Sequence, residues 1–459
     1  MQPSFTKEPS SFRDPSGYIF EKDGCLFRQV NQIFKEEFDF FNQSGCYQKL
    51  VDKGLLIPHK VINENLTGDS HCYTTLQPEP VPFITYPYEW SFDMLKDAAL
   101  LTLRITKEAM ASKMILKDAT PFNIQWYRGK LIFIDTLSFE KYDASKPWIA
   151  YRQFCECFLS PLLIMHYKKI TLQNLMLSYP DGIPVTVTKN LLPRRTKLSL
   201  HLYLHIHLQA KYAGRKTNTK DKPVNFSEKK MINILTSLES VIKNLKSPTT
   251  TTVWSDYYEE AAQRNQYIEE KKSIIREWIN HFADIKTALD VGANDGLFSK
   301  LTAQNGIYTI AADADHTCVN ALYNYCKLEK VKNIQPMTID FSNPTPAIGF
   351  NLTERKSLFQ RVQTDLVLAL AFIHHLVFTK NISFIQLATL FTRLSKKYLL
   401  IEFVPKDDPK VQEMLLNKPD IYPDYLIENF ENAFSATFTI VKKQSIANSG
   451  RTLYLMEKQ

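Results

Sequence analysis

The spacing of apolar residues in the first third of the chain predicts strands mixed with helices. From residue 17, apolar and polar positions alternate on both sides of Asp23-Gly24, a dipeptide typical of a tight β-hairpin. Apolar residues at helical spacing then predict amphipathic helices over residues 33–50 and 92–112. A second hairpin and a strand ending at residue 134 come next. Residues 17–145 are therefore predicted to form an α+β module, after a loose polar arm at residues 1–16.

Residues 146–250 are predicted to be a helical region that ends in a linker. Within it, residues 198–212 are ambiguous, because strict alternation favours a strand whereas His201 and His205 are spaced as on one helix face. These two histidines and His207 suggest a metal site, but no nearby carboxylate or cysteine completes a ligand set, so we predict no metal. The segment K-S-P-T-T-T-T at residues 246–252 is the predicted domain boundary.

Residues 251–459 alternate between short apolar runs and helical stretches, after a predicted helix that starts near Asp256. This pattern is typical of a mostly parallel, doubly wound α/β sheet, whose ligands bind at the carboxyl ends of the strands. The first three strands are predicted to end near Asp290, Asp313 and Asp340. A fourth strand begins at residue 364, a fifth ends at residues 402–405, and residues 438–443 and 452–456 are predicted to form a closing hairpin.

The run T-A-L-D-V-G-A-N-D-G-L-F-S at residues 287–299 predicts a buried strand, a glycine turn and a helix. Gly292 and Gly296 let the backbone approach a ligand closely, and the next helix presents free N–H groups there. A dinucleotide-binding turn needs a further glycine where this chain has Asn294, so NAD and FAD are disfavoured.

The spacing D-x-G-x-x-x-G resembles motif I of class I S-adenosylmethionine-dependent methyltransferases. This resemblance implies a Rossmann-like fold for residues 251–459 and S-adenosylmethionine as the cofactor. It places Asp290 and Gly292 near the methionine part, Asp313 on the ribose and Asp340 at the adenine. The other residues that it implies for cofactor binding are Asn294, Gly296, Phe341 and Ala369.

Three later segments resemble a nodulation-protein-like bacterial subgroup of these methyltransferases, over most of the chain. They are A-L-A-F-I-H-H-L from residue 369, E-F-V-P-K-D-D-P-K-V from residue 402 and S-G-R-T-L-Y-L from residue 449. His374 or His375, at the carboxyl end of strand four, is the predicted general base. Glu402 is a weaker candidate, as a residue that lines the acceptor pocket.

The residues directly after strand four narrow the identity of the methyl acceptor. The N/D-P-P-Y/F motif that usually accompanies methylation of adenine or glutamine amino groups is absent there, and no cysteine nucleophile for carbon methylation is present at that place. We therefore expect O- or N-methylation of a small-molecule, glycan or protein acceptor, presented by the N-terminal half. The alternatives are a SAM-binding regulatory protein without catalysis, or a bifunctional kinase–methyltransferase.

The kinase alternative depends on Asp118, Asn123 and Asp135, whose spacing resembles the catalytic core of protein-kinase-like folds. In that family the first Asp orients a hydroxyl, and the Asn and second Asp hold magnesium. The chain departs from the pattern in three ways: it has no glycine-rich phosphate loop, Arg28 stands where a lysine is expected, and Thr-Leu comes after Asp135. Two interpretations stay open, a kinase-like shell reused for binding and an ordinary turn with capping residues.

Composition adds few constraints. The net charge of +8 is too diffuse to indicate nucleic acid, which we do not expect as a partner. Seven cysteines without a pairing pattern suggest reduced thiols in a cytoplasmic protein. The N-terminus lacks the apolar core of a signal peptide and no stretch of eighteen apolar residues occurs, so no membrane partner is expected. The sequence predicts no particular oligomeric state.

Overall fold

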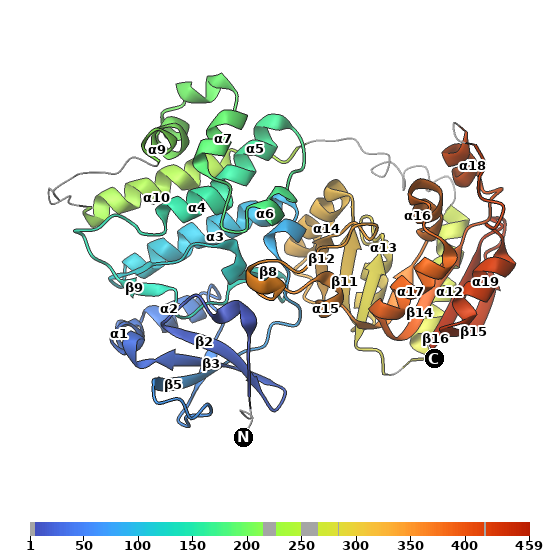
Figure 1. The fold of residues 1–459 in the computed structure, drawn as a ribbon, viewed down its shortest axis with the longest axis horizontal. Coiled ribbons are helices and arrows are strands. Elements are labelled where there is room, and N and C mark those ends of the chain that lie inside the picture. Colours follow the sequence, from blue (N-terminus) through green and yellow to red (C-terminus); the bar gives the residue numbers. More distant parts are fainter. Residues whose placement is uncertain (1–4, 214–225, 249–264, 283, 417–418) are drawn as a thin grey trace. The chain divides into compact units, whose positions relative to one another are not determined.

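The computed structural model describes residues 5–213, 226–248, 265–282, 284–416 and 419–459 (Figure 1). The chain forms two compact units. Unit 1 holds residues 1–250 together with residues 347–355, and unit 2 holds residues 251–346 and 356–459. Residues 249–252 of the predicted linker, and Asp256 at the predicted helix start, lie outside the described residues.

An antiparallel five-stranded sheet forms the start of unit 1. Its order is β1 (Thr6–Lys7), β2 (Gly17–Lys22), β3 (Cys25–Asn31), β5 (Cys72–Pro78) and β4 (His59–Ile62). The predicted hairpin is confirmed, with Asp23 and Gly24 at φ angles of 52° and 72° between β2 and β3. The predicted loose arm is wrong for the described part, because β1 pairs with β2 and Arg13 forms a bidentate ion pair with Glu354.

The next helices depart from prediction at one glycine. The helix predicted over residues 33–50 is divided into α1 (Lys35–Gln43) and α2 (Cys46–Asp52), because Gly45 adopts a left-handed conformation with φ of 73°. Helix α3 (Phe92–Met110) matches its prediction and begins at Ser91, whose hydroxyl accepts from the N–H of Met94. Four short strands then form two antiparallel pairs: β7 (Ile124–Tyr127) with β8 (Lys130–Phe133) as a hairpin, and β6 (Met114–Leu116) with β9 (Phe139–Lys141), which flank it in sequence.

The rest of unit 1 is helical, and this resolves the ambiguous run at residues 198–212 as helix. Its helices are α4 (Tyr151–Phe154), α5 (Ser160–Lys168), α6 (Leu175–Ser178), α7 (Val185–Leu191), α8 (Leu200–Leu202), α9 (Gln209–Tyr212) and α10 (Glu228–Lys243). Two π-helical segments, η5 (Cys155–Leu159) and η7 (Tyr203–Leu208), interrupt them. Among the described helices of the whole chain, none is both long and apolar enough to cross a membrane.

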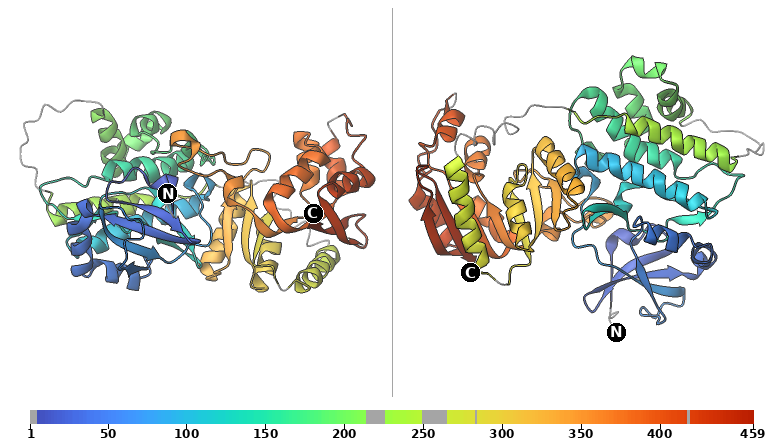
Figure 2. Two further views of the ribbon diagram at one scale, coloured as in Figure 1. Left: turned by 60° about the horizontal axis from the view of Figure 1, so that its bottom comes forward. Right: turned by 180° about the vertical axis from the view of Figure 1, so that it is seen from behind.

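Unit 2 is built on a seven-stranded sheet that confirms the doubly wound prediction (Figure 2). Its strands are β10 (Thr287–Val291), β11 (Tyr308–Asp313), β12 (Ile334–Thr338), β13 (Thr364–Ala369), β14 (Ser395–Phe403), β15 (Phe438–Ser445) and β16 (Thr452–Lys458). Their order is β12-β11-β10-β13-β14-β16-β15. The first five are parallel, whereas β16 runs antiparallel to both β14 and β15, as the predicted closing hairpin requires.

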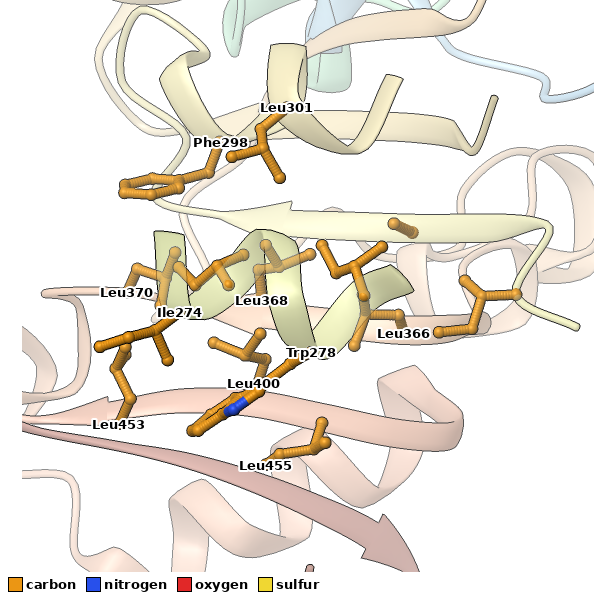
Figure 3. Close-up of a cluster of buried hydrophobic side chains, with 14 of the residues drawn as sticks. Ile274, Trp278, Phe298, Leu301, Leu366, Leu368, Leu370, Leu400, Leu453 and Leu455 are labelled. Carbon is orange, nitrogen blue, oxygen red and sulfur yellow. The ribbon is translucent and has the colours of Figure 1, made fainter. Parts of the chain in front are cut away.

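Helices cover both faces of this sheet. They are α12 (Asn265–Asn280), α13 (Leu297–Gln304), α14 (His316–Leu328), α15 (Leu358–Arg361), α16 (Ile373–Lys380), α17 (Phe384–Leu394), α18 (Pro409–Leu415) and α19 (Ile427–Ser435). Figure 3 shows Ile274 and Trp278 of α12 packed against leucines of β13, β14 and β16. Because side chains alternate along a strand, Leu400 and Glu402 share the face toward α12, while Phe403 packs against Phe384 and Phe430 of α17 and α19.

Candidate cofactor site

The predicted cofactor residues gather where the strand order of unit 2 reverses. Strand β10 lies between β11 and β13, and the chain continues from it in both directions across the sheet. At its carboxyl end, Val291 is level with Ala312 of β11 and with Ala369 of β13. In doubly wound sheets, ligands bind in the crevice outside the strand ends at this switch point.

The turn after β10 needs its glycines for two separate reasons. Gly292 and Gly296 have φ angles of 73° and 80°, in the left-handed region that side chains disfavour. A Cβ atom on Gly292 would also lie 2.7 Å from Cδ2 of Phe372, and one on Gly296 would lie 2.6 Å from Cδ1 of Leu322. Between them, Asn294 is also left-handed, with φ of 50°.

The carboxylate of Asp313, at the end of β11, is held against this turn. Its Oδ2 accepts from the backbone N–H of Asn294 at 2.8 Å, and its Oδ1 accepts from the N–H of Asp315 at 2.8 Å. Burial raises the pKa of Asp313, and the N–H groups oppose that shift. Each carboxylate oxygen has a second lone pair, so the group can still accept from two hydroxyls of a ligand.

The side chain of Asp290 is more deeply buried than that of Asp313. Its side chain is 2% exposed and accepts from the hydroxyl of Ser299 in α13 at 2.6 Å. Burial raises the pKa of Asp290 to about 6, and the charge of Asp313 adds to this rise. The carboxylate therefore ties β10 to α13 beneath the glycine turn.

The raised pKa of Asp290 predicts how the stability of the protein changes with pH. Below the ordinary pKa of 3.8 the stability contributed by protonated Asp290 is complete, and it is lost as the pH rises through about 6. Asp290→Asn stays neutral, and its amide oxygen can still accept from Ser299. We expect the variant to gain stability over the parent as the pH rises from 4 to 7, by on the order of 1–3 kcal/mol. Urea unfolding at pH 4, 5, 6 and 7 measures this, and a difference that stays constant with pH would contradict it.

The third predicted acid, Asp340, comes after β12 and is exposed. Its Oδ1 accepts from the N–H of Ser342 at 2.8 Å and from the Ser342 hydroxyl at 2.6 Å. The neighbouring Phe341 is buried and meets Phe372 edge to face, with ring centroids 6.1 Å apart. Sequence reasoning missed Phe372, which touches both Phe341 and the Gly292 turn; the signal was an aromatic residue just before the histidine pair.

His374 and His375 lie in the first turn of helix α16, which begins at Ile373 after the loop at the end of β13. Their ring centroids are 4.0 Å apart, and His374 is 2% exposed. Among the described residues the buried Nδ1 of His374 has no hydrogen-bond partner. Burial lowers the pKa of His374 well below its ordinary value, helped by nearby positive charge, and lowers that of His375 to about 4. Both imidazoles are therefore neutral at pH 7.

Glu402, predicted as a weak acceptor contact, is fully buried and surrounded by protein donors. Its Oε2 accepts from the Ala371 N–H at 2.7 Å and from Lys271 Nζ at 2.5 Å, and its Oε1 accepts from the Tyr267 hydroxyl at 2.6 Å. Burial alone would raise the pKa of Glu402, but Lys271 and Arg451 outweigh it and hold the pKa at about 2. These contacts favour a structural role over contact with a substrate.

The partners of Glu402 come from distant parts of unit 2 and were not predicted. Tyr267 and Lys271 lie on α12, and Arg451 precedes β16. Arg451 also donates from Nε and Nη2 to Asp408, at 2.8 Å and 3.1 Å. The available signal was a glutamate inside the apolar strand L-L-I-E-F, which requires a buried cation.

This network also fixes the loop that carries the histidines. Ala371 has φ of 50°, a conformation that costs a residue with a Cβ about 1 kcal/mol or more. The carboxylate of Glu402 accepts the Ala371 N–H and so supports that conformation. Phe372 and His374 come directly afterwards, and their positions therefore depend on Glu402.

In unit 1, the three residues of the kinase-like pattern do meet. Asn123 Nδ2 donates to Asp118 Oδ2 at 3.1 Å and to Ser138 Oγ at 3.3 Å, and Ser138 donates in turn to Asp135. Burial raises the pKa of Asp118, and the charge of Asp135 adds to it. Arg28 Nη1, however, lies 2.6 Å from Asp135 Oδ1 and already neutralises that carboxylate.

The three histidines considered for a metal site are bound by hydroxyl groups of more than one residue. His201 Nδ1 and His205 Nε2 lie 2.6 Å and 2.8 Å from Ser237 Oγ, whereas His207 Nε2 lies 2.9 Å from Thr196 Oγ1. Within the described ranges, no group of three or more His, Cys, Asp or Glu residues is arranged to hold a metal ion.

The sheet order, the single antiparallel strand and the glycine turn define unit 2 as a class I S-adenosylmethionine-dependent methyltransferase fold. A comparison with curated proteins then gives the family. The chain is 32% identical over 461 residues to the nodulation protein NoeA of Rhizobium meliloti (strain 1021), across 98% of this chain and 95% of that protein. The chain belongs to the NoeA nodulation-protein family, which confirms the predicted nodulation-protein resemblance.

No protein-family model matches the chain. Among solved structures, it is similar to magnesium protoporphyrin IX methyltransferase from Synechocystis PCC 6803, with 14% identity and a TM-score of 0.33, over 42% of this chain and 84% of that one. It is also similar to the bifunctional kinase–methyltransferase WbdD, with 18% identity and a TM-score of 0.28, over 43% of this chain and 39% of that one. The fold assignment rests on the strand order and not on these distant likenesses.

Proposed function

We propose that this protein transfers a methyl group from S-adenosylmethionine to an oxygen or nitrogen atom of a small-molecule, glycan or protein acceptor. The observation that carries the proposal is the 2.8 Å hydrogen bond from the Asn294 N–H to Asp313. It joins the glycine turn of the first strand to the acid of the second strand at the switch point of the sheet. This is where an adenosyl ligand is expected to lie.

The residues present fit this cofactor. Asp313 has free lone pairs for the two ribose hydroxyls, and the glycine turn leaves its backbone open to the methionine part. Asp340 is exposed beside the buried ring of Phe341, as binding of the adenine amine and cover of its ring require. Asp290 supports the turn from below through Ser299.

S-adenosylmethionine supplies a methyl group on a sulfonium; a lone pair of the acceptor would attack this methyl in line with the carbon–sulfur bond, and S-adenosylhomocysteine would leave as a neutral thioether. The task left to the chain is to place the acceptor and to take its proton. His374 is the better candidate base, because its imidazole is neutral and its buried Nδ1 has no hydrogen-bond partner among the described residues. Glu402 acts indirectly, because it accepts the Ala371 N–H and so holds the turn that positions His374.

The two competing functions differ in what they predict for ligands. A regulatory protein would bind S-adenosylmethionine and transfer nothing. A bifunctional kinase–methyltransferase would also bind ATP with magnesium through Asp118, Asn123 and Asp135. The ion pair between Arg28 and Asp135 weighs against that alternative, because it occupies the carboxylate that would hold the metal.

Two measurements on the full chain test the proposed function. Isothermal titration calorimetry should detect S-adenosylmethionine and S-adenosylhomocysteine, and no ATP–magnesium. Transfer of label from methyl-tritiated S-adenosylmethionine should then be traced into separate pools of small hydroxylated molecules, oligosaccharides and proteins. Absence of S-adenosylmethionine binding would overturn the proposal, and ATP binding that is lost in Asp135→Ala would instead support the kinase alternative.

The base assignment gives a separate prediction. We expect His374→Gln to lower turnover by about 100-fold or more, the usual effect of removing a general base, while S-adenosylmethionine affinity stays unchanged. His375→Gln should cost less, and His281→Gln, which changes an exposed histidine of unit 2, should cost nothing. Rates are measured with the acceptor that the labelling experiment identifies. Full turnover in both the His374 and His375 variants would show that neither is the base.

A further inference from the structure

An apolar strip lies on the outer side of the chain between the end of η6 (Arg194–Leu198) and the start of η7 (Tyr203–Leu208). Leu198, Leu200 and Leu204 are 89%, 68% and 42% exposed, and Tyr203 is 38% exposed. Leu200, Tyr203 and Leu204 stand at positions i, i+3 and i+4, so their side chains share one helix face. We call these four residues the Leu198 strip.

The opposite face of the same segment already anchors it in unit 1. Leu202, His205 and Ile206 are 4%, 3% and 0% exposed. His205 is held further by the Tyr151 hydroxyl, 2.7 Å from its Nδ1, and by the Ser237 hydroxyl, 2.8 Å from its Nε2. The segment therefore cannot turn its strip inward, and the exposed parts of these side chains stay on the outer face of unit 1.

The strip is a cluster and not a scatter of single exposed residues. Of 21 exposed large apolar side chains among the described residues, four lie within the seven residues 198–204. Single exposed leucines are ordinary in soluble proteins, whereas apolar side chains gathered on one face mark an interaction site.

The charged residues next to the Leu198 strip are all basic. Arg194, Arg195 and Lys197, which we call the basic triplet, are all exposed and directly precede it. Over residues 182–213 the sequence contains five Lys or Arg and no Asp or Glu. A basic triplet beside exposed leucines has the chemistry of a segment that lies in the plane of a membrane surface.

We propose that the Leu198 strip and the basic triplet dock unit 1 onto the surface of an anionic lipid bilayer. The leucines enter the boundary between headgroups and acyl chains, and the triplet contacts lipid phosphates. A second copy of the chain would use the leucines alone and leave the basic triplet without an acidic partner, because residues 182–213 contain no Asp or Glu. A nucleic acid fits less well because aliphatic side chains offer no stacking surface.

Surface binding of this kind is independent of the proposed function. The expectation of no membrane partner was drawn from the lack of a spanning segment, and the described helices still contain none. An interfacial segment needs no such length, because its backbone stays helical and only one face leaves the water.

The test is co-sedimentation of the full-length protein with vesicles. We expect binding to vesicles that contain phosphatidylglycerol and phosphatidylcholine, weak binding to phosphatidylcholine alone, and loss of binding at high salt. The triple variant L198S/L200S/L204S and the triple variant R194Q/R195Q/K197Q should each lower the partition coefficient by about 10-fold or more. The control L328S changes a leucine that is 77% exposed elsewhere and should bind like the parent.

Each other outcome overturns the proposal. One is that the parent does not bind phosphatidylglycerol vesicles, and another is that it binds equally to both vesicle types. A third is that both triple variants bind like the parent. A fourth is that light scattering shows a dimer that only L198S/L200S/L204S dissolves, without vesicle binding, which would assign the strip to a second copy. Thermal unfolding of every variant confirms that loss of binding is not loss of fold.

Discussion

Glu402→Ala is expected to destabilise unit 2 more than any other single change considered for this chain. The substitution leaves Lys271 buried without the carboxylate that lies 2.5 Å from its Nζ, and it removes the acceptor for the Ala371 N–H. Removing one partner of a buried ion pair typically costs about 3–5 kcal/mol, because an uncompensated charge stays in the interior. The free energy of unfolding from urea or guanidinium titration measures this loss.

Two controls distinguish the buried pair from charge pairing in general. Asp284→Ala breaks an exposed pair with Lys397 on the same unit, and should cost far less than Glu402→Ala, because water screens an exposed pair. The double variant Lys271→Met/Glu402→Leu removes both charges and should recover part of the loss, since buried pairs can be replaced by apolar side chains. A cost below about 1 kcal/mol for Glu402→Ala would show that the network is not a main support of the fold.

The pKa of Glu402 predicts the direction in which the stability of unit 2 changes with pH. The pKa of Glu402 is depressed to about 2, against a burial effect that alone would raise it. A depressed carboxyl pKa gives stability that is present above the ordinary value and is lost as the pH falls through about 2. Mild acid should therefore leave this part of unit 2 folded.

Asp313→Ala is expected to have the largest effect on cofactor affinity. The variant loses the carboxylate proposed to accept both ribose hydroxyls, and charge-assisted hydrogen bonds contribute about 1.5–3 kcal/mol each. We expect the dissociation constants of S-adenosylmethionine and S-adenosylhomocysteine to rise by about 100-fold or more, and by similar factors, because the ribose is common to both. Calorimetry on the full chain measures both.

The same substitution also removes two hydrogen bonds within the protein, to Asn294 and Asp315, so a second variant is needed. Asp313→Asn keeps an oxygen acceptor for one of them and should lose less stability than Asp313→Ala, yet still bind the cofactor weakly. Asp284→Ala is the matched control, an exposed aspartate of unit 2 whose loss should leave affinity unchanged. Tight binding by both Asp313 variants would contradict the placement of the ribose.

Local patterns were sufficient for the strands of unit 2 and for the order of its site residues, but not for the separate helices after β12. Each strand is an apolar run that ends in a polar or glycine turn, and period and composition specify such runs locally. The turn with Gly292 and Gly296 was found in the same way, because both glycines adopt left-handed angles that leave a local signature. The division of residues 33–50 at Gly45 was missed, because one glycine can end a helix or be tolerated within it.

The sequence by itself determined the succession of strands and helices, the glycine turn and the acids at the strand ends. Only the tertiary structure decided that Glu402 is enclosed by Lys271 and Arg451, and that the described residues leave the outer face of residues 198–204 exposed. The reason is physical. A strand or turn depends on neighbours within a few residues, whereas Lys271 lies 131 residues from Glu402 along the chain, and the exposure of a helix face depends on segments equally distant in sequence.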